Sequence, residues 1–319
     1  MDNQSGNHSQ GQQSLQTAIL ALQEYVSQRI VGQATLVNRL LVALLADGHL
    51  LVEGAPGLAK TRAVKVLADG VEGVFHRVQF TPDLLPADLT GTEVYRPQDG
   101  SFVFQQGPLF HNLILADEIN RAPAKVQSAL LEAMGERQIT VGRKTYALPK
   151  LFLVMATQNP IEQEGTYPLP EAQMDRFAMR FSLGYVSEEE ELEILSSQAV
   201  SHPIDALQPC LNLEQVRAIK KASINIRVTD ELRRYIVQLV GATRNHPDIQ
   251  MGASPRATIT LMKSAQALAL IRGIEFVTPD IIQELALPII AHRLALNSDS
   301  TFSGSSAINL LQSIIDDTP

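Results

Sequence analysis

Two kinds of hydrophobic pattern alternate over the first half of the chain. Leu36, Leu40 and Leu44, each with the apolar residue that follows it, recur every four positions, which predicts a helix with one apolar face. Short runs that are almost continuously apolar alternate with helical segments and cover residues 50–52, 74–80, 113–116, 151–156 and 177–183. Strands that are buried on both faces show such runs, so the pattern predicts a parallel sheet sandwiched by helices, an α/β fold.

The strand pattern ends near residue 184, and only helical signals follow. Ser187 and Glu190 have the spacing of a capping box, and Thr278-Pro279 has the form of an N-cap followed by proline at the first helical position. We therefore predict an α/β domain over residues 15–184 and a smaller all-α domain over residues 185–319. Residues 1–14 are polar, contain glycine and lack an apolar period, which predicts a disordered N-terminal tail.

Composition sets limits on this organisation. A chain of 319 residues, of which 45% are hydrophobic and 19% charged, has the size of about two domains and an ordinary globular composition. No apolar run is long enough to cross a bilayer, and the N-terminus has no basic stretch followed by an apolar one, so we expect a cytoplasmic protein without a membrane span. The net charge of −8 argues against nucleic-acid binding, and the single Cys210 excludes an intrachain disulfide.

A glycine-containing turn between an apolar run and a helical segment carries the first candidate chemistry. Its residues are Gly54, Ala55, Pro56, Gly57, Leu58, Ala59, Lys60, Thr61 and Arg62. In a phosphate-binding loop of this form, backbone N–H groups and the helix N-terminus face the phosphates. Lys60 would reach the β- and γ-phosphates of a nucleotide, and the Thr61 hydroxyl would hold Mg²⁺. Ala59 stands where the strict motif has its second glycine, so we expect helical dihedral angles there, because only a positive φ requires glycine.

Two later apolar runs end in polar side chains. Asp117 and Glu118 follow the run 113–116, and the carboxyl ends of parallel strands line the ligand crevice of an α/β sheet. Asp117 can order the Mg²⁺ shell, and Glu118 can polarise a water for attack on the γ-phosphate. After the run 151–156, Asn159 or Thr157 could hydrogen-bond that water or the phosphate; the alternative is that Asn159-Pro160 only forms a turn.

Two arginines are further candidates. Arg176 immediately precedes the last apolar run, and its permanent charge and forked donors suit contact with the γ-phosphate of a neighbouring subunit. The alternative is an ion pair of Arg176 with Asp175 or Glu171 of its own chain. Arg256 opens a helix in the second domain, where it could touch nucleotide or only be solvated.

The order of these motifs resembles that of AAA+ ATPases, and the amino-acid sequences of the individual motifs resemble those of the MoxR family. The similar segments are residues 54–61, 79–91, 116–122, 156–160 and 171–177. The resemblance implies that Lys60 and Thr61 form the Walker A pair and that Asp117 and Glu118 form the Walker B pair. It also implies that Asn159 is sensor 1, Arg176 the arginine finger and Arg256 sensor 2, and that Val31, Gly32 and Gln33 pack on adenine.

Two segments of alternating pattern around glycine-containing turns, residues 91–107 and 137–146, predict β-hairpins. They fit the inserts that one branch of AAA+ proteins has in the second helix of the core and before sensor 1. In that branch the helical lid is displaced, so Arg256 can act on its own nucleotide or on a neighbour's.

The resemblance further implies ATP and Mg²⁺ as cofactors, a homo-oligomer in the form of a hexameric ring, and a chaperone-like remodelling or maturation role. The partners would be a protein with a von Willebrand factor A domain and an unknown client protein. A chelatase-type motor subunit for metal insertion shares the inserts and is an alternative. A nucleotide-gated scaffold with little turnover is another. DNA remodelling has no support from the acidic charge.

Overall fold

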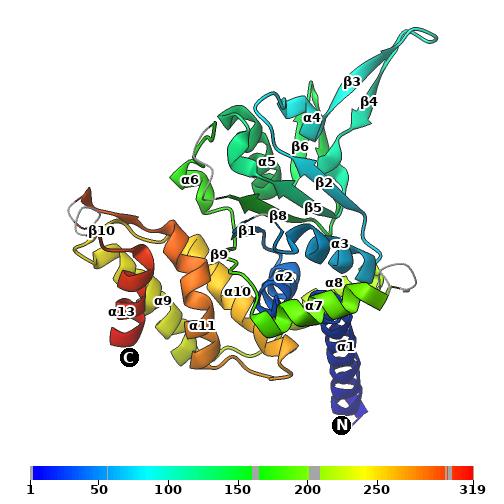
Figure 1. Cartoon of the computed structure of the whole chain (residues 1–319). Helices are drawn as coiled ribbons and strands as arrows, with labels where there is room; N and C mark the ends of the chain where they lie inside the picture. The colour runs from blue at the N-terminus through cyan, green and yellow to red at the C-terminus, as the bar shows by residue number, and fades with distance from the viewer. Residues whose placement is uncertain are drawn as a thin grey trace.

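A five-stranded parallel sheet forms the centre of the computed structural model, which describes residues 3–55, 57–159, 165–200, 209–298, 300 and 304–318 (Figure 1). The strands are β1 (Leu50–Glu53), β2 (Phe75–Gln79), β5 (Leu113–Asp117), β8 (Leu153–Gln158) and β9 (Met179–Ser182). Their order across the sheet is β2-β5-β8-β1-β9, and all neighbouring pairs are parallel. Each strand coincides, within a few residues, with one of the five predicted apolar runs.

Helices cover both faces of this sheet because successive side chains of a strand point to opposite sides. Leu50, Val52 and Leu113 belong to one hydrophobic cluster, together with α1 (Asn3–Ser27), α2 (Ala34–Ala46) and α3 (Lys60–Gly70). Leu51 and Ile114 belong to a second cluster on the other face, together with α4 (Pro86–Thr90) and α5 (Ala124–Glu136). The predicted fold class, a parallel sheet sandwiched by helices, is confirmed.

The helical part of the chain follows β9 and consists of α7 (Glu188–Val200), α8 (Leu213–Ile224), α9 (Asp230–Asn245), α10 (Pro255–Ile271), α11 (Pro279–Ile290) and α13 (Ala307–Asp317). The short antiparallel pair β10 (Ile249–Met251) and β11 (Ala295–Leu296) and the 3-10 turn η3 (Ala291–Arg293) complete it. The capping box that opens α7 is confirmed: the Ser187 N–H donates to Glu190 Oε2 at 2.8 Å, and the Glu190 N–H donates to Ser187 Oγ at 3.3 Å.

The helical part shares a continuous core with the N-terminal helices. Helix α10 packs on α2, and α8 packs on α1 and α2, so residues from both ends of the chain lie in one hydrophobic cluster. The division into residues 15–184 and 185–319 therefore stays a proposal based on the end of the strand pattern. No helix in the described part of the chain is long and apolar enough to cross a membrane.

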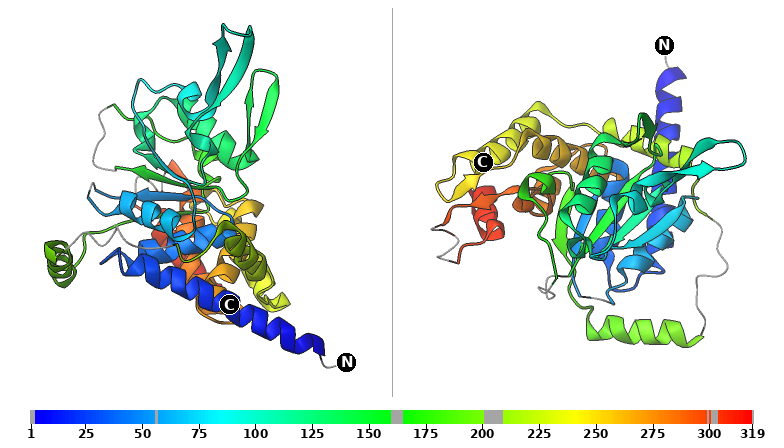
Figure 2. Two further views of the ribbon diagram at one scale, coloured as in Figure 1. Left: turned by 90° about the vertical axis from the view of Figure 1, so that its right-hand side faces the viewer. Right: turned by 90° about the horizontal axis from the view of Figure 1, so that it is seen from above.

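Helix α1 includes residues 3–14 of the predicted N-terminal tail. The structure places residues 3–27 in one helix that extends away from the body of the molecule (Figures 1 and 2). The physical reason is the cooperativity of helices: Ile19, Leu22 and Val26 are buried and anchor the helix, and each further residue is then added without a new nucleation step. A polar composition predicts the lack of a buried face but does not prevent such an extension.

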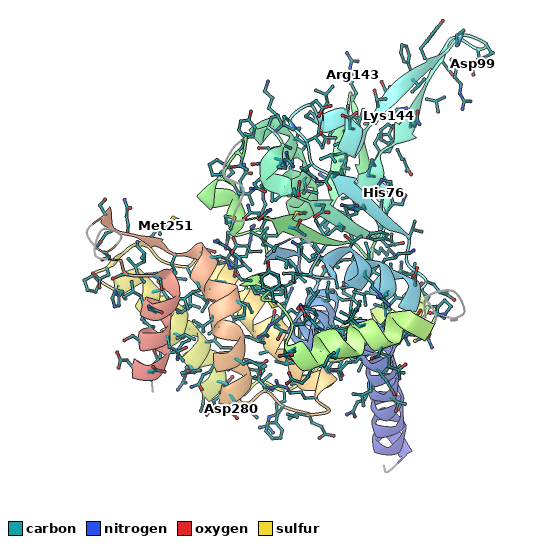
Figure 3. All side chains as sticks on the ribbon, in the orientation of Figure 1. His76, Asp99, Arg143, Lys144, Met251 and Asp280 are labelled. Atoms are coloured by element: carbon teal, nitrogen blue, oxygen red, sulfur yellow. The ribbon has the colours of Figure 1, made fainter. Side chains whose placement is uncertain are left out.

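Two β-hairpins project from the sheet part (Figures 1 and 2), as predicted. The first pairs β3 (Gly91–Arg96) with β4 (Ser101–Gln106), and the second pairs β6 (Gln138–Val141) with β7 (Lys144–Ala147). The rings of Phe104 and Tyr146 stack at 4.2 Å between centroids and join the two hairpins. Charged side chains lie at the tips, with Asp99 on the first and Arg143 and Lys144 on the second (Figure 3).

Candidate active site

The predicted phosphate-binding loop lies where β1 passes into α3, at the carboxyl end of the sheet. A cavity of about 360 Å³ opens there, which we call the loop cavity. Its lining residues are Gly54, Gly57, Leu58, Ala59, Lys60, Thr61, Arg62, Arg77, Asp117, Glu118, Thr157 and Asn159. The structure thus brings together most of the predicted phosphate, metal and water-activating residues. Ala55 is partly buried against the core instead, and Pro56 lies outside the described residues.

Lys60 and the N-terminus of α3 make the loop cavity suitable for an anion. The Lys60 ammonium donates to the Gly54 carbonyl at 2.8 Å. Burial lowers the pKa of Lys60, and the neighbouring Asp117 and Glu118 carboxylates oppose that shift. The first N–H groups of a helix have no partner within the helix and carry a partial positive charge, which favours a phosphate at this place.

The backbone at Ala59 differs from the sequence-based expectation. Ala59 has φ 57° and ψ 12°, a left-handed conformation at the N-cap of α3, whereas we expected helical angles. Gly57, two residues earlier, also has a positive φ of 87°. The turn therefore needs a left-handed residue where the strict motif has glycine, and an alanine adopts it at a cost of roughly 1–2 kcal/mol relative to a right-handed residue.

Thr157 joins the two acidic residues at the carboxyl end of β5. Its hydroxyl donates to Asp117 Oδ1 at 2.5 Å and accepts from the Glu118 N–H at 2.9 Å. Glu118 has φ 56°, so the chain turns sharply after the strand. Thr157, which the sequence offered only as an alternative to Asn159, holds both acids in place, while Asn159 also lines the loop cavity and is buried.

Sequence reasoning missed two residues of strand β2. Arg77 donates to Asp117 Oδ2 from Nη2 at 2.7 Å and from Nε at 3.1 Å, and it also donates to Gln79 Oε1 at 3.0 Å. Gln79 in turn donates to Glu118 Oε2 at 2.7 Å, an atom that also accepts from Arg121 at 3.2 Å. The sequence contained a signal for these residues, because Arg77 and Gln79 are polar positions inside an apolar run. That run forms the strand that pairs with the strand of Asp117.

The residues of the loop cavity fit a nucleotide-bound Mg²⁺. Thr61 and Asp117 both line it and offer oxygen ligands, which this hard cation prefers. No group of three or more His, Cys, Asp or Glu side chains that could hold a metal occurs among the described residues. Such a group is not needed, since Mg²⁺ in phosphate-transferring sites takes one or two protein ligands and fills its shell with phosphate oxygens and water.

The segment Val31-Gly32-Gln33, expected to pack on adenine, does not line the loop cavity. Gly32 has φ +73°, and a Cβ there would lie 2.5 Å from Val186 Cγ1. Gln33 is buried and donates to the Gly184 carbonyl at 3.4 Å. The structure thus places this segment against the chain that leaves β9, and its contact with adenine stays a prediction.

Arg176 and Arg256 lie together at the opposite, amino end of the sheet. They line a second cavity of about 370 Å³, which we call the basic cavity, with Asp47, His49, Arg137, Asp175, Lys263 and Arg293 among its other residues. Strand β1 begins directly after His49, which lines the basic cavity, and ends directly before Gly54, which lines the loop cavity, so the two cavities lie at opposite ends of this strand.

The Asp175 carboxylate does not serve as the partner of Arg176 that the sequence suggested. It lies 2.7 Å from Arg293 Nε and 3.7 Å from Arg256 Nη1. The side chain of Glu171, the other suggested partner, lies outside the described residues.

Comparison with known proteins gives two family matches along the chain. Residues 49–179 match the profile described as the ATPase family associated with various cellular activities (AAA), and residues 241–313 match the AAA lid domain. The first match contains the loop cavity, and the second contains Arg256 and Arg293.

Relatives are similar over most of their length. The chaperone MoxR1 of Mycobacterium tuberculosis is 47% identical over 284 residues, which cover 86% of this chain and 75% of that protein. The uncharacterized protein YeaC of Bacillus subtilis is 46% identical over 292 residues, which cover 92% and 91%. The protein MoxR of Paracoccus denitrificans is 30% identical over 292 residues, which cover 84% and 86%. A crystal structure of a provisionally assigned ATPase from Cytophaga hutchinsonii superimposes with a TM-score of 0.91 at 41% identity, covering 98% of each chain.

Proposed function

The chain belongs to the MoxR family of AAA+ ATPases, and we propose that it hydrolyses ATP at the interfaces between subunits of a ring. One observation carries the proposal: the loop cavity with Lys60 lies at the carboxyl end of β1, and the basic cavity with Arg176 and Arg256 lies at its amino end. Within one chain these arginines are remote from the phosphate site. This separation supports a contribution of both arginines to the nucleotide of another copy.

In the proposed hydrolysis, each residue of the loop cavity has a separate role. Lys60 exchanges its bond to the Gly54 carbonyl for phosphate oxygens, and the N–H groups at the start of α3 bind the same anion. When bound, Mg²⁺ would be held by Thr61 and Asp117 and would neutralise charge on the phosphates. Glu118 accepts a proton from the attacking water, and Thr157 keeps the Glu118 backbone in register with Asp117. Asn159, which lines the loop cavity, would orient that water or the γ-phosphate.

Arg176 of one subunit completes the site of the next. An arginine finger supplied in trans contributes roughly 10³–10⁵ to the hydrolysis rate, so activity should require assembly. Arg256 shares the basic cavity with Arg176, which supports a trans role for it too. A heterologous interface of this kind closes into a ring when the rotation between subunits fits, and six subunits is the number that the family resemblance implies.

The proposed biological role is chaperone-like remodelling or maturation of partner proteins. The support is the similarity to the chaperone MoxR1. A partner with a von Willebrand factor A domain, a protein client and a cytoplasmic location belong to the same proposal, and the net charge of −8 gives no support to nucleic acid as the client. The projecting hairpins β3–β4 and β6–β7 are the surfaces that would meet such a client (Figure 1).

Steady-state ATPase rates measured against protein concentration test the proposal. The wild type should become more active per subunit as it assembles, and Glu118→Gln should bind ATP without turnover. Arg176→Ala and Lys60→Ala should each be inactive alone, but mixed rings should regain up to about a quarter of the activity, the share of interfaces that join an intact loop cavity to an intact arginine. Absence of activity at every concentration would instead favour the nucleotide-gated scaffold, and failure of the mixture to recover would exclude action in trans.

A further inference from the structure

Arg293, in the 3-10 turn η3 of the helical part, is almost completely buried, with 2% of its side chain exposed. Its guanidinium is directed at the loop of residues 175–178, which carries Arg176. Arg293 Nε donates to Asp175 Oδ1 at 2.7 Å, Nη2 donates to the Phe177 carbonyl at 2.8 Å and to the Asp175 carbonyl at 3.3 Å, and Nη1 donates to the Ala178 carbonyl at 3.5 Å. A single side chain therefore holds both the carboxylate and the backbone of this loop.

Other residues of the helical part converge on the same loop. Ser254 Oγ, at the N-cap of α10, donates to Asp175 Oδ2 at 3.1 Å, and Arg256 lies 3.7 Å from that oxygen. His292 Nε2 lies 3.2 Å from the Phe177 carbonyl. Asp175 thus connects η3, the start of α10 and the loop of Arg176. The Asp175 carboxylate thus links Arg256 to the loop that carries Arg176, the two arginines that we assign to the neighbouring nucleotide.

The loop cavity shows no comparable attachment. All of the residues that line it belong to the sheet part of the chain, at or before Asn159. Among the described residues, the helical part is therefore fastened to the arginines at the amino end of the sheet and contributes nothing to the lining around its own Lys60. Movement of the helical part would shift Arg176 and Arg256 relative to the neighbour's nucleotide.

We propose that Arg293, acting through Asp175, is a positioning residue that holds Arg176 and Arg256 as one unit for catalysis in the adjacent subunit. The proposal rests on the trans arginine of the proposed function. A buried ion pair is not needed for stability alone, because apolar residues of similar volume often stabilise a protein as well or better. The planar fork of arginine, however, fixes the direction of several acceptors at once, which suits the placing of a neighbouring side chain.

The magnitude follows from the geometric demand of phosphoryl transfer. A catalytic group displaced by about 1 Å can cost on the order of 10²-fold in rate. Arg293→Met should therefore lower kcat by about 10²-fold, while the dissociation constant of a fluorescent ATP analogue at the intact loop cavity stays within about twofold of the wild-type value. Arg293→Lys keeps the charge but not the fork and should lose most of the rate as well. A residue that only supports the fold would impair binding and turnover together.

Mixed rings give the decisive measurement, because the proposed defect of Arg293→Met affects the arginines of a subunit but not its loop cavity. Arg293→Met should regain activity when mixed with Lys60→Ala, whose arginines are intact and can serve the loop cavity of the variant. It should stay inactive when mixed with Arg176→Ala, because both partners then lack a working arginine. Arg39→Gln is the matched control: Arg39 of α2 also joins the sheet part to the helical part, through Glu284 of α11 at 3.7 Å, but it does not touch residues 175–178. It should keep its kcat.

The outcomes separate this inference from the proposed function. If Lys60→Ala and Arg176→Ala recover activity together but Arg293→Met and Lys60→Ala do not, the role of Arg293 is wrong and the trans arginine stands. If Lys60→Ala and Arg176→Ala fail together, both fall. Equal loss of kcat in Arg39→Gln would also overturn the inference, since it would reduce Arg293 to a general domain contact. Should Arg293→Met not fold, Asp175→Asn and Arg293→Lys carry the same test.

Discussion

Two histidines should make the protein unstable in mild acid. His49, which precedes β1, is buried; its Nδ1 accepts from the Val154 N–H at 3.1 Å, and Nε2 lies 3.4 Å from the Met134 carbonyl. Burial, assisted by the charge of Arg137, lowers the pKa of His49 to about 3. Burial and the neighbouring Arg293 guanidinium lower the pKa of His292 to about 3 as well. Both rings are therefore neutral in the folded protein at neutral pH.

The sign of the effect follows from proton binding. An unfolded histidine has a pKa near 6.5, so below that pH the unfolded chain binds protons that the folded chain does not. The free energy of unfolding is fully retained above about pH 6.5 and decreases as the pH falls from there toward 3. With a folded pKa of about 3 for His49, the loss between pH 7 and pH 5 is about 2 kcal/mol. His292 keeps some exposure to solvent and should add less, so the pair accounts for roughly 2–4 kcal/mol.

Urea unfolding at pH 7 and pH 5 measures this loss, and His49→Asn and His292→Asn assign it. Each variant loses hydrogen bonds and is expected to be less stable than the wild type at pH 7. Its further loss on going to pH 5 should nevertheless be smaller by the share of the histidine removed, about 2 kcal/mol for His49. A wild type whose midpoint does not change between the two pH values, or variants with the same pH dependence as the wild type, would show that these rings can accept protons in the folded state.

Three substitutions in the loop cavity give further predictions. Lys60→Ala should weaken ATP binding by about 10²-fold, because a charge-assisted contact with phosphate contributes roughly 1.5–3 kcal/mol. Titration with a fluorescent ATP analogue measures the affinity, and an unchanged affinity would contradict the contact of Lys60 with phosphate. Arg77→Gln should lower the Mn²⁺ concentration that half-saturates the loop cavity about fivefold, because the half-exposed ion pair of Arg77 competes for Asp117 and contributes about 1 kcal/mol. Electron paramagnetic resonance measures the bound Mn²⁺. A higher concentration for half-saturation would show that Arg77 assists metal binding. Ala59→Gly should raise the free energy of unfolding slightly, whereas Lys65→Gly at an exposed position inside α3 should lower it by about 1 kcal/mol. Urea unfolding measures both, and changes of equal sign would contradict the left-handed conformation at Ala59.

The sequence predicted those features that depend on local pattern. The five strands, the two hairpins and the capping box at Ser187 each follow from residues close together in the chain, and all are present. The expectation for Ala59 was wrong, because its angles depend on the path of the chain from β1 into α3. The helix over residues 3–14 also depends on more than local composition, since the buried residues that follow anchor it.

Side-chain contacts between neighbouring strands could not be predicted from the local sequence pattern, for a different reason. Arg77 meets Asp117, and Gln79 meets Glu118, only because β2 and β5 lie side by side in parallel with Gln79 opposite Asp117. Knowing that both runs are strands does not settle that they are neighbours or in which register they pair, and a shift of one residue would turn every side chain to the other face. The contacts of Arg293 with Asp175 require, in addition, the placement of the helical part.

The proposed need for more than one copy rests on the directions of the five sheet strands. All five strands run the same way, so residues at or just after their carboxyl ends, such as Gly54 and Asp117, collect at one end of the sheet. Residues that precede the strands, such as His49 and Arg176, collect at the other end. A chain of this topology keeps its acid pair and its arginine loop apart whatever its side chains do. Arg293 holds that loop against the helical part, so in the proposed ring a movement of one subunit's helical part would shift the arginine offered to the next subunit.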